Sequence, residues 1–132
     1  MADSTLKLLA RGLMLGVGVL IMGDSSHINL LLENLITNSK QALEGKIDGE
    51  IKVKCDIEDS NNALVLTVTD NGCGIQDESI DKIFDPFFST KPDKGIGLGL
   101  NKVKRISDLY HGKITVESVP NKFTTFKVII PI

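Results

Sequence analysis

The pattern that most constrains the fold lies in two neighbouring segments near the middle of the chain. From Ile51 to Ile57 apolar and charged residues alternate strictly, which predicts a strand with one buried face. A polar turn at residues 59–62 leads to a second expected strand, Ala63–Thr69, which is rich in β-branched residues. Because strands of this kind bury one face against other elements, a sheet packed with helices is expected. The predicted buried face of the first strand holds Ile51, Val53, Cys55 and Ile57.

Helical spacing elsewhere in the chain supplies the covering layer. A long helix is expected from Asp24 or Ser25, either of which suits an N-cap, to about Leu43, with Gly45 ending it. Its apolar residues recur at helical spacing: Ile28, Leu31, Leu32, Leu35, Ile36 and Ala42. The other expected elements are one or two strands before Met22, a short helix near Glu78–Ile83, a helix over Leu98–Tyr110 closed by Gly112, and strands Lys113–Ser118 and Thr124–Ile130. The predicted fold class is an α/β sandwich, built as one domain over residues 1–132.

Composition excludes several classes of protein. A formal charge of −2 argues against a general nucleic-acid binder, which needs a basic surface. Cys55 and Cys73 lack metal-site spacing and are expected to be reduced thiols of a cytoplasmic protein. The apolar run Gly12–Gly23 follows two basic residues, as in a signal peptide, but it is too short to span a bilayer and lacks a cleavage site. We therefore expect buried strand there and no direct membrane contact.

Two asparagines mark the expected long helix. Asn34 and Asn38 are four residues apart, so their amides point to the same side of the helix. The side-chain oxygen of Asn38 is a ligand that Mg²⁺ accepts while it shares its other positions with water and phosphates. The same pair also fits two exposed amides on a solvated face.

A glycine-containing loop follows the second strand. Asp70 comes first, and Gly72 and Gly74 follow at alternate positions, where they let the backbone approach a flat ligand. A carboxylate there can accept a hydrogen bond from the exocyclic amine of adenine, where guanine presents an acceptor. Asn71-Gly72 is also an ordinary tight-turn signal.

Two further segments complete the set. Residues 84–91 hold three phenylalanines within five residues and end at Lys91; they fit either a loop fixed to the core by its rings or a lid with a lysine for phosphate. Residues 95–101 place three glycines at the start of the second long helix, where free N–H groups and the helix dipole favour an anion. Their spacing is neither the dinucleotide fingerprint nor a P-loop.

In their order along the chain, these four segments resemble the N, G1, F and G2 boxes of the histidine-kinase-like ATPases, over roughly residues 24–132. Within that group they are most similar to the sensor histidine kinases, and the lid resembles the short lids of the nitrogen-regulatory and sporulation type. The resemblance implies the Bergerat fold, a mixed sheet covered on one face by helices, with ATP held between the helices and the lid.

The resemblance also implies roles for single residues. Asn38 is expected to bind Mg²⁺, Asn34 to support the phosphates, and Asp70 to hold adenine above Gly72 and Gly74. Gln41 stands where many relatives carry a basic residue, and Lys91 is expected to take over its phosphate contact. The remaining residues implied to contact the nucleotide are Ile75, Phe84, Gly95, Gly97, Leu98, Gly99, Leu100 and Thr125.

Two activities compete for such a site, and a non-enzymatic nucleotide sensor is a third alternative. Conformational ATPases of the gyrase B and mismatch-repair kind carry a glutamate base four residues before the magnesium asparagine. Here Asn34 stands there, and Glu33 lies about 100° around the helix. An amide cannot take up a proton, which favours a kinase. His27 and His111 do not lie in the acceptor motif of the histidine kinases. The resemblance therefore implies two partners, a separate dimerisation and phosphoacceptor domain and a downstream response regulator.

Overall fold

The computed structural model describes residues 7–11, 25–58, 60, 62–88 and 99–131, and for residues 7–11, 25 and 26 it describes the backbone alone. The elements are β1 (Lys7–Arg11), α2 (Ser25–Ala42), β2 (Glu50–Glu58), β3 (Ala63–Asp70), α3 (Gly99–Leu109), β4 (Lys113–Val119) and β5 (Phe123–Pro131). β1 supplies one of the strands predicted before Met22. The strand predicted over Gly12–Gly23 and the N-cap position Asp24 lie outside the described residues.

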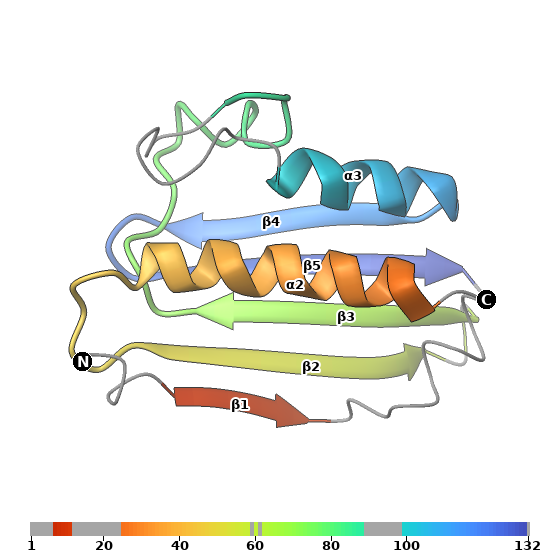
Figure 1. The fold of residues 1–132 in the computed structure, drawn as a ribbon, viewed down its shortest axis with the longest axis horizontal. Coiled ribbons are helices and arrows are strands. Elements are labelled where there is room, and N and C mark those ends of the chain that lie inside the picture. The colour runs from red at the N-terminus through yellow and green to blue at the C-terminus, as the bar shows by residue number, and fades with distance from the viewer. Residues whose placement is uncertain (1–6, 12–24, 59, 61, 89–98, 132) are drawn as a thin grey trace.

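The five strands form one mixed sheet in the order β1-β2-β3-β5-β4. β1 is parallel to β2, because the connection between them contains α2, and every other neighbouring pair is antiparallel. Both helices lie on the same face of the sheet, with α2 over its middle and α3 beside β4 (Figure 1). The predicted α/β sandwich is confirmed.

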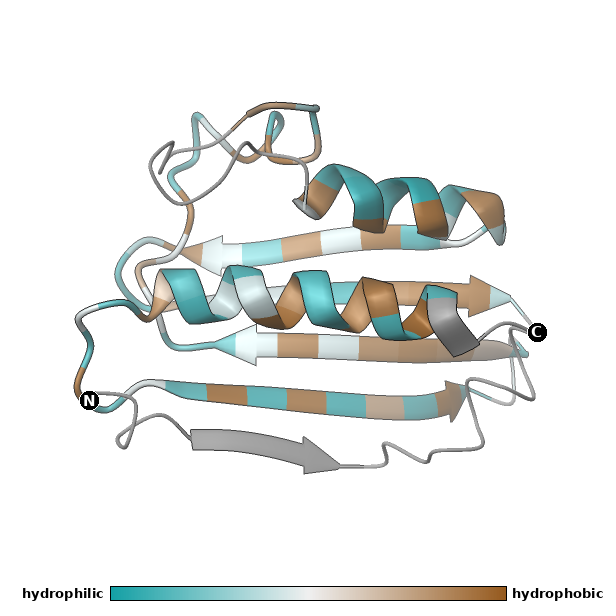
Figure 2. Cartoon of the chain, in the orientation of Figure 1, coloured by the Kyte–Doolittle hydropathy of each residue, from teal (hydrophilic) through white to brown (hydrophobic). Residues whose placement is uncertain are grey.

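The core lies between the helices and this face. Ile51 and Val53 on β2 are buried while Lys52 and Lys54 are exposed, an alternation visible along the strand (Figure 2). Leu31 and Leu35, one turn apart on α2, have no exposed surface. Ile57 departs from the prediction, because it sits beside the β2–β3 turn at the end of the sheet and is 48% exposed.

The helix predicted near Glu78–Ile83 is wrong. The segment forms successive turns, in which Ile80 N–H donates to Asp77 O at 3.4 Å and Lys82 N–H donates to Ser79 O at 2.8 Å. A segment this short does not offset the cost of helix nucleation. Pro86 also prevents its extension, since a proline disfavours helical geometry in the residue before it.

The end of α3 differs from the prediction in which residue turns the chain. His111, not Gly112, adopts the left-handed conformation, with φ of 59°. His111 N–H donates to Asp108 O at 3.0 Å and Gly112 N–H to Ser107 O at 2.7 Å, which is the Schellman arrangement. Gly112 is needed for space, because a Cβ there would lie 2.7 Å from Ile129 O.

Candidate nucleotide-binding site

The loop that follows β3 begins with a buried carboxylate. Asp70 is 1% exposed, and its Oδ1 accepts a hydrogen bond from Gly72 N–H at 2.8 Å. It is the last residue of β3, opposite Ile51 on β2 and Thr124 on β5. The sheet therefore places this side chain on the helix-covered face, at the end of the central strands.

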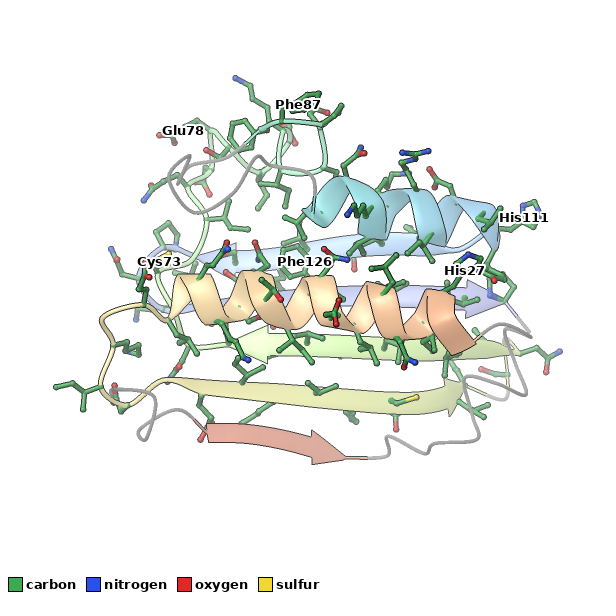
Figure 3. All side chains as sticks on the ribbon, viewed as in Figure 1. His27, Cys73, Glu78, Phe87, His111 and Phe126 are labelled. Atoms are coloured by element: carbon green, nitrogen blue, oxygen red, sulfur yellow. The ribbon has the colours of Figure 1, made fainter. Side chains whose placement is uncertain are left out.

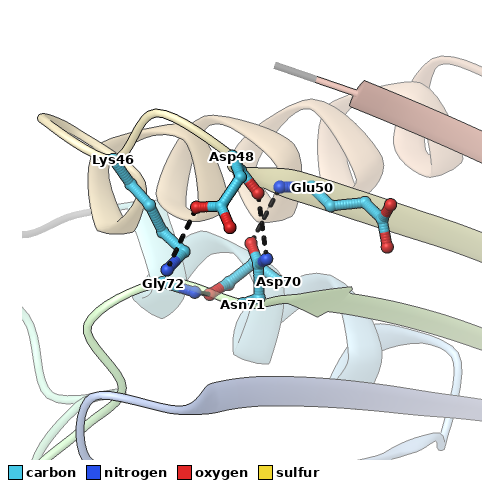
Figure 4. Close-up of polar contacts among 6 residues, drawn as sticks. All are labelled: Lys46, Asp48, Glu50, Asp70, Asn71 and Gly72. Carbon is cyan, nitrogen blue, oxygen red and sulfur yellow. Dashed lines mark hydrogen bonds and ion pairs between the residues drawn. The ribbon is translucent and has the colours of Figure 1, made fainter. Parts of the chain in front are cut away.

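One side of the loop is tied to the connection between α2 and β2. Asn71 Oδ1 accepts from Glu50 N–H at 2.8 Å, and its Nδ2 donates to Asp48 O at 3.1 Å (Figure 4). Cys73 N–H also donates to Ala42 O at 3.0 Å, at the end of α2. The side chain of Asn71 therefore fixes the loop to the α2–β2 connection directly beside Asp70. The Asn-Gly turn signal in the sequence gave no indication of this role.

The other side of the loop is tied to the turn between β4 and β5. Asn121 N–H donates to Cys73 O at 2.7 Å, and Ile75 N–H donates to Ser118 Oγ at 2.8 Å. Asn121 has φ of 64°, a left-handed conformation that asparagine adopts more readily than most residues, in a turn that lacks glycines. The loop is held by hydrogen bonds from both sides.

Both glycines of the loop have a packing reason. A Cβ on Gly72 would lie 2.5 Å from Ala42 O, and a Cβ on Gly74 would lie 2.4 Å from Val119 O. Gly74 also has φ of 71°, which disfavours other residues. The glycines allow the loop to lie between α2 and the β4–β5 turn, and their predicted place beneath the base stays a prediction.

Thr125 is not brought to the site. It lies opposite Thr69, and the two hydroxyls are hydrogen-bonded at 2.9 Å on the sheet face away from the helices. Thr124 lies on the same face as Asp70, directly across from it, and is 2% exposed. The alternation of buried residues along β5, in which Phe126 is also buried, is a signal that could have selected Thr124.

One of the two asparagines of α2, Asn34, faces the beginning of α3. Asn34 and Asn38 are both half-buried. Asn34 Nδ2 donates to Leu30 O at 2.8 Å, and its Oδ1 lies 3.2 Å from the position that a Cβ on Gly99 would take. Leu100 follows and packs against the core. The structure therefore brings the first and fourth motifs together.

The aromatic segment is fixed to the core by two of its three rings. Phe84 meets Phe126 edge to face at 6.2 Å, and Phe84 O accepts from Asn101 Nδ2 at 3.0 Å. Phe88 also packs on the core, whereas Phe87 has φ of 68° and is 71% exposed. This contact of Asn101 was not predicted. Lys91, Gly95, Gly97 and Leu98 lie outside the described residues.

Both histidines lie far from the Asp70–Ile75 loop. His27 Nδ1 is hydrogen-bonded to the Tyr110 hydroxyl, so it joins the start of α2 to the end of α3. His27 and His111 lie at the opposite end of the domain from Cys73 of the loop (Figure 3). Neither histidine lies beside the candidate site, where a phosphoryl acceptor would have to be.

Comparison with known proteins agrees with these motifs. Residues 23–132 match the family described as histidine kinase-, DNA gyrase B- and HSP90-like ATPase. The chain belongs to this family. Membership in this family implies that the chain binds ATP.

Two curated relatives and one solved structure illustrate the similarity. A probable C4-dicarboxylate sensor kinase of Halalkalibacterium halodurans is 37% identical over 142 residues, covering 99% of this chain and 27% of that protein. The C4-dicarboxylate transport sensor protein DctB of Rhizobium meliloti is 40% identical over 111 residues, covering 84% of this chain and 17% of that protein. The catalytic domain of histidine kinase ThkA is 27% identical, with a TM-score of 0.73 and coverage of 98% of this chain and 80% of that one. The chain thus spans about a quarter or less of these curated relatives.

Proposed function

We propose that this chain is the ATP-binding catalytic domain of a sensor histidine kinase, which donates the γ-phosphoryl group of ATP to a histidine on a separate dimerisation domain. The observation that carries the proposal is an amide in place of a base. Asn34 stands four residues before Asn38, and its side chain faces Gly99 at the start of α3. A site with no base beside the phosphates leaves ATP intact until a better nucleophile arrives.

Adenine recognition is assigned to Asp70, with Thr124 taking the place first given to Thr125. Both side chains lie on the helix-covered face and are almost fully buried, at 1% and 2% exposure. In a water-poor site a hydrogen bond is stronger, and a wrong partner costs more. A carboxylate acceptor therefore favours the adenine amine over the keto group of guanine. Ile75 and Phe84, both packed against the core, are assigned to the walls of the site.

Phosphate and metal binding are assigned to the meeting point of the two helices. Asn38 offers a half-buried amide oxygen, the neutral donor that Mg²⁺ accepts alongside phosphate oxygens. Gly99 and Leu100 begin α3, whose N-terminus favours anions. Bound Mg²⁺ would neutralise charge on the phosphates. Lys91, Gly95, Gly97 and Leu98 are assigned to the same phosphates from their motifs.

The alternative is a conformational ATPase of the gyrase B or mismatch-repair kind. It would need a carboxylate base in place of Asn34. Glu33 is the adjacent candidate, but it is exposed, while Asn34 is half-buried against α3. The arrangement of these two residues favours the kinase.

The proposal also includes the cellular compartment and the protein partners of the domain. The domain would act in the cytoplasm with its dimerisation domain and a response regulator, and without nucleic acid or direct membrane contact. Among the residues that the structure describes, no helix is long and apolar enough to cross a membrane.

Nucleotide titrations test the assignment. Wild type should bind ATP more tightly than GTP, and Asp70→Asn should lose most of that preference, because the new amide can donate to the guanine oxygen. Asp56→Asn, an exposed change on β2, is the matched control. Asn38→Ala should abolish the gain in affinity that Mg²⁺ gives. Equal affinity of wild type for ATP and GTP would contradict the adenine site.

A further inference from the structure

A single hydroxyl joins the Asp70–Ile75 loop to two strands. Ser118, on β4, accepts from Ile75 N–H at 2.8 Å and donates to Phe123 O at 2.7 Å. Its Oγ also lies 2.9 Å from Oγ1 of Thr124. Ser118 pairs with Thr124 in the β4–β5 register, and Thr124 in turn pairs with Asp70. The three side chains therefore form a row across the helix-covered face.

The donors in this network follow from counting protons. A serine hydroxyl carries one proton and two lone pairs. Phe123 O can only accept, so it takes the Ser118 proton. Ile75 N–H can only donate, so it uses one lone pair. The bond between Ser118 and Thr124 must then run from the Thr124 hydroxyl to the remaining lone pair of Ser118.

This direction leaves Thr124 with lone pairs alone for any further partner. Asp70, directly opposite, is an acceptor when ionised. The amino group of adenine carries two hydrogens and can satisfy two acceptors, whereas a keto oxygen at the same ring position carries none. A keto oxygen placed against two acceptors this deeply buried, at 1% and 2% exposure, would gain no hydrogen bond from them, which disfavours the keto base.

We propose that Ser118 is a positioning residue that fixes the hydrogen-bond polarity of Thr124, so that the site selects a 6-amino purine and rejects a 6-keto purine. The inference rests on the proposed function, since it assumes that the purine contacts Asp70 and Thr124. Ser118 itself acts through Thr124 and through the loop residue Ile75.

The test compares ATP with inosine triphosphate, which has a keto oxygen at that position. Ser118→Ala frees the Thr124 proton to donate to the keto oxygen. One added hydrogen bond corresponds to a gain of about 3- to 10-fold in inosine triphosphate affinity. ATP affinity should not rise comparably, so the preference for ATP falls. If Ser118 merely stabilised the loop, Ser118→Ala should instead lower inosine triphosphate affinity, because a loosened loop binds both nucleotides more weakly.

Further variants show whether the change in preference comes from the polarity of Thr124. Thr125→Val removes one hydroxyl of the bonded pair on the opposite face of the same strands and should leave the preference unchanged. Ser118→Thr keeps a hydroxyl and should retain the wild-type preference. In a Thr124→Val background, Ser118→Ala should no longer raise inosine triphosphate affinity. If Ser118→Ala does not fold, Ser118→Cys replaces it, because its weak acceptor sulfur should give a smaller gain in the same direction.

The outcomes separate the two proposals. Equal binding of both nucleotides by wild type overturns the adenine site itself. A clear wild-type preference for ATP, with inosine triphosphate affinity unchanged or lowered in Ser118→Ala, keeps the adenine site and overturns the role of Ser118.

Discussion

Two glycines with similar positive φ but different surroundings allow the packing of the Asp70–Ile75 loop to be measured. Gly74 has φ of 71° and Gly45, after α2, has φ of 83°. A Cβ on Gly45 would meet nothing within 4 Å, whereas a Cβ on Gly74 would lie 2.4 Å from Val119 O and 2.8 Å from Pro120 Cα. Both neighbours of Gly74 are backbone atoms, which cannot rotate away.

The difference in surroundings predicts a difference in stability. Placing alanine in the left-handed region costs about 1–2 kcal/mol, and this is the whole cost expected for Gly45→Ala. Gly74→Ala adds overpacking of about 1–3 kcal/mol, for a total of about 2–5 kcal/mol. With a urea m-value of about 1–3 kcal/mol/M, the midpoint of Gly74→Ala should fall roughly 1 M further than that of Gly45→Ala.

Urea unfolding followed by circular dichroism gives both midpoints, and ATP titration gives a second measurement. Gly74→Ala should weaken ATP binding while Gly45→Ala should not, because only Gly74 belongs to the site loop. Equal midpoints for the two variants, or a milder effect at Gly74, would refute the packing described for the loop.

Two other predictions concern a side-chain clamp and a buried thiol. Asn71→Ala leaves Glu50 N–H without its side-chain acceptor, so it should lower the unfolding free energy by about 1–3 kcal/mol and weaken ATP binding. The control Asn29→Ala, at an exposed position, should change the unfolding free energy by no more than about 0.5 kcal/mol. An unchanged unfolding free energy in Asn71→Ala would exclude a stabilising role for the Asn71 side chain. Burial raises the pKa of the Cys55 thiol, and the Asp56 carboxylate raises it to a smaller extent. The contribution of the neutral thiol to folding stability is therefore complete below the unfolded thiol pKa of about 8.5 and is lost as pH rises through the folded pKa. As pH rises above the unfolded thiol pKa, the thermal midpoint of wild type should therefore fall more steeply than that of Cys55→Val. The same dependence of the midpoint on pH in both proteins would contradict this prediction.

The sequence was sufficient for the elements whose side-chain period is long and regular. The alternation around Ile51 and Val53 and the apolar stripe through Leu31 and Leu35 gave β2 and α2 to within a residue or two. Period alone failed at Glu78–Ile83, where nucleation cost and a nearby proline outweighed local propensity.

The motifs of the site could be predicted from the sequence, but the pairing of residues between its strands could not. Thr125 and Thr124 are one residue apart, and in a strand one residue moves a side chain to the opposite face. The pairing with Asp70 that decides between them joins residues 54 positions apart. The contacts of Asn71, Ser118 and Asn101 are likewise long-range hydrogen bonds that no local pattern encodes.

Phosphoryl transfer to histidine is the central claim, and radiolabelling with γ-labelled ATP and Mg²⁺ tests it most directly. The domain alone should bind ATP, hydrolyse it very slowly and remain unlabelled, because neither His27 nor His111 lies beside the site and Asn34 supplies no base. Adding the phosphoacceptor hairpin of its kinase as a second chain should give an acid-labile, base-stable phosphate on the hairpin. Brisk hydrolysis by the domain alone, lost in Glu33→Gln, would contradict the kinase and favour a conformational ATPase.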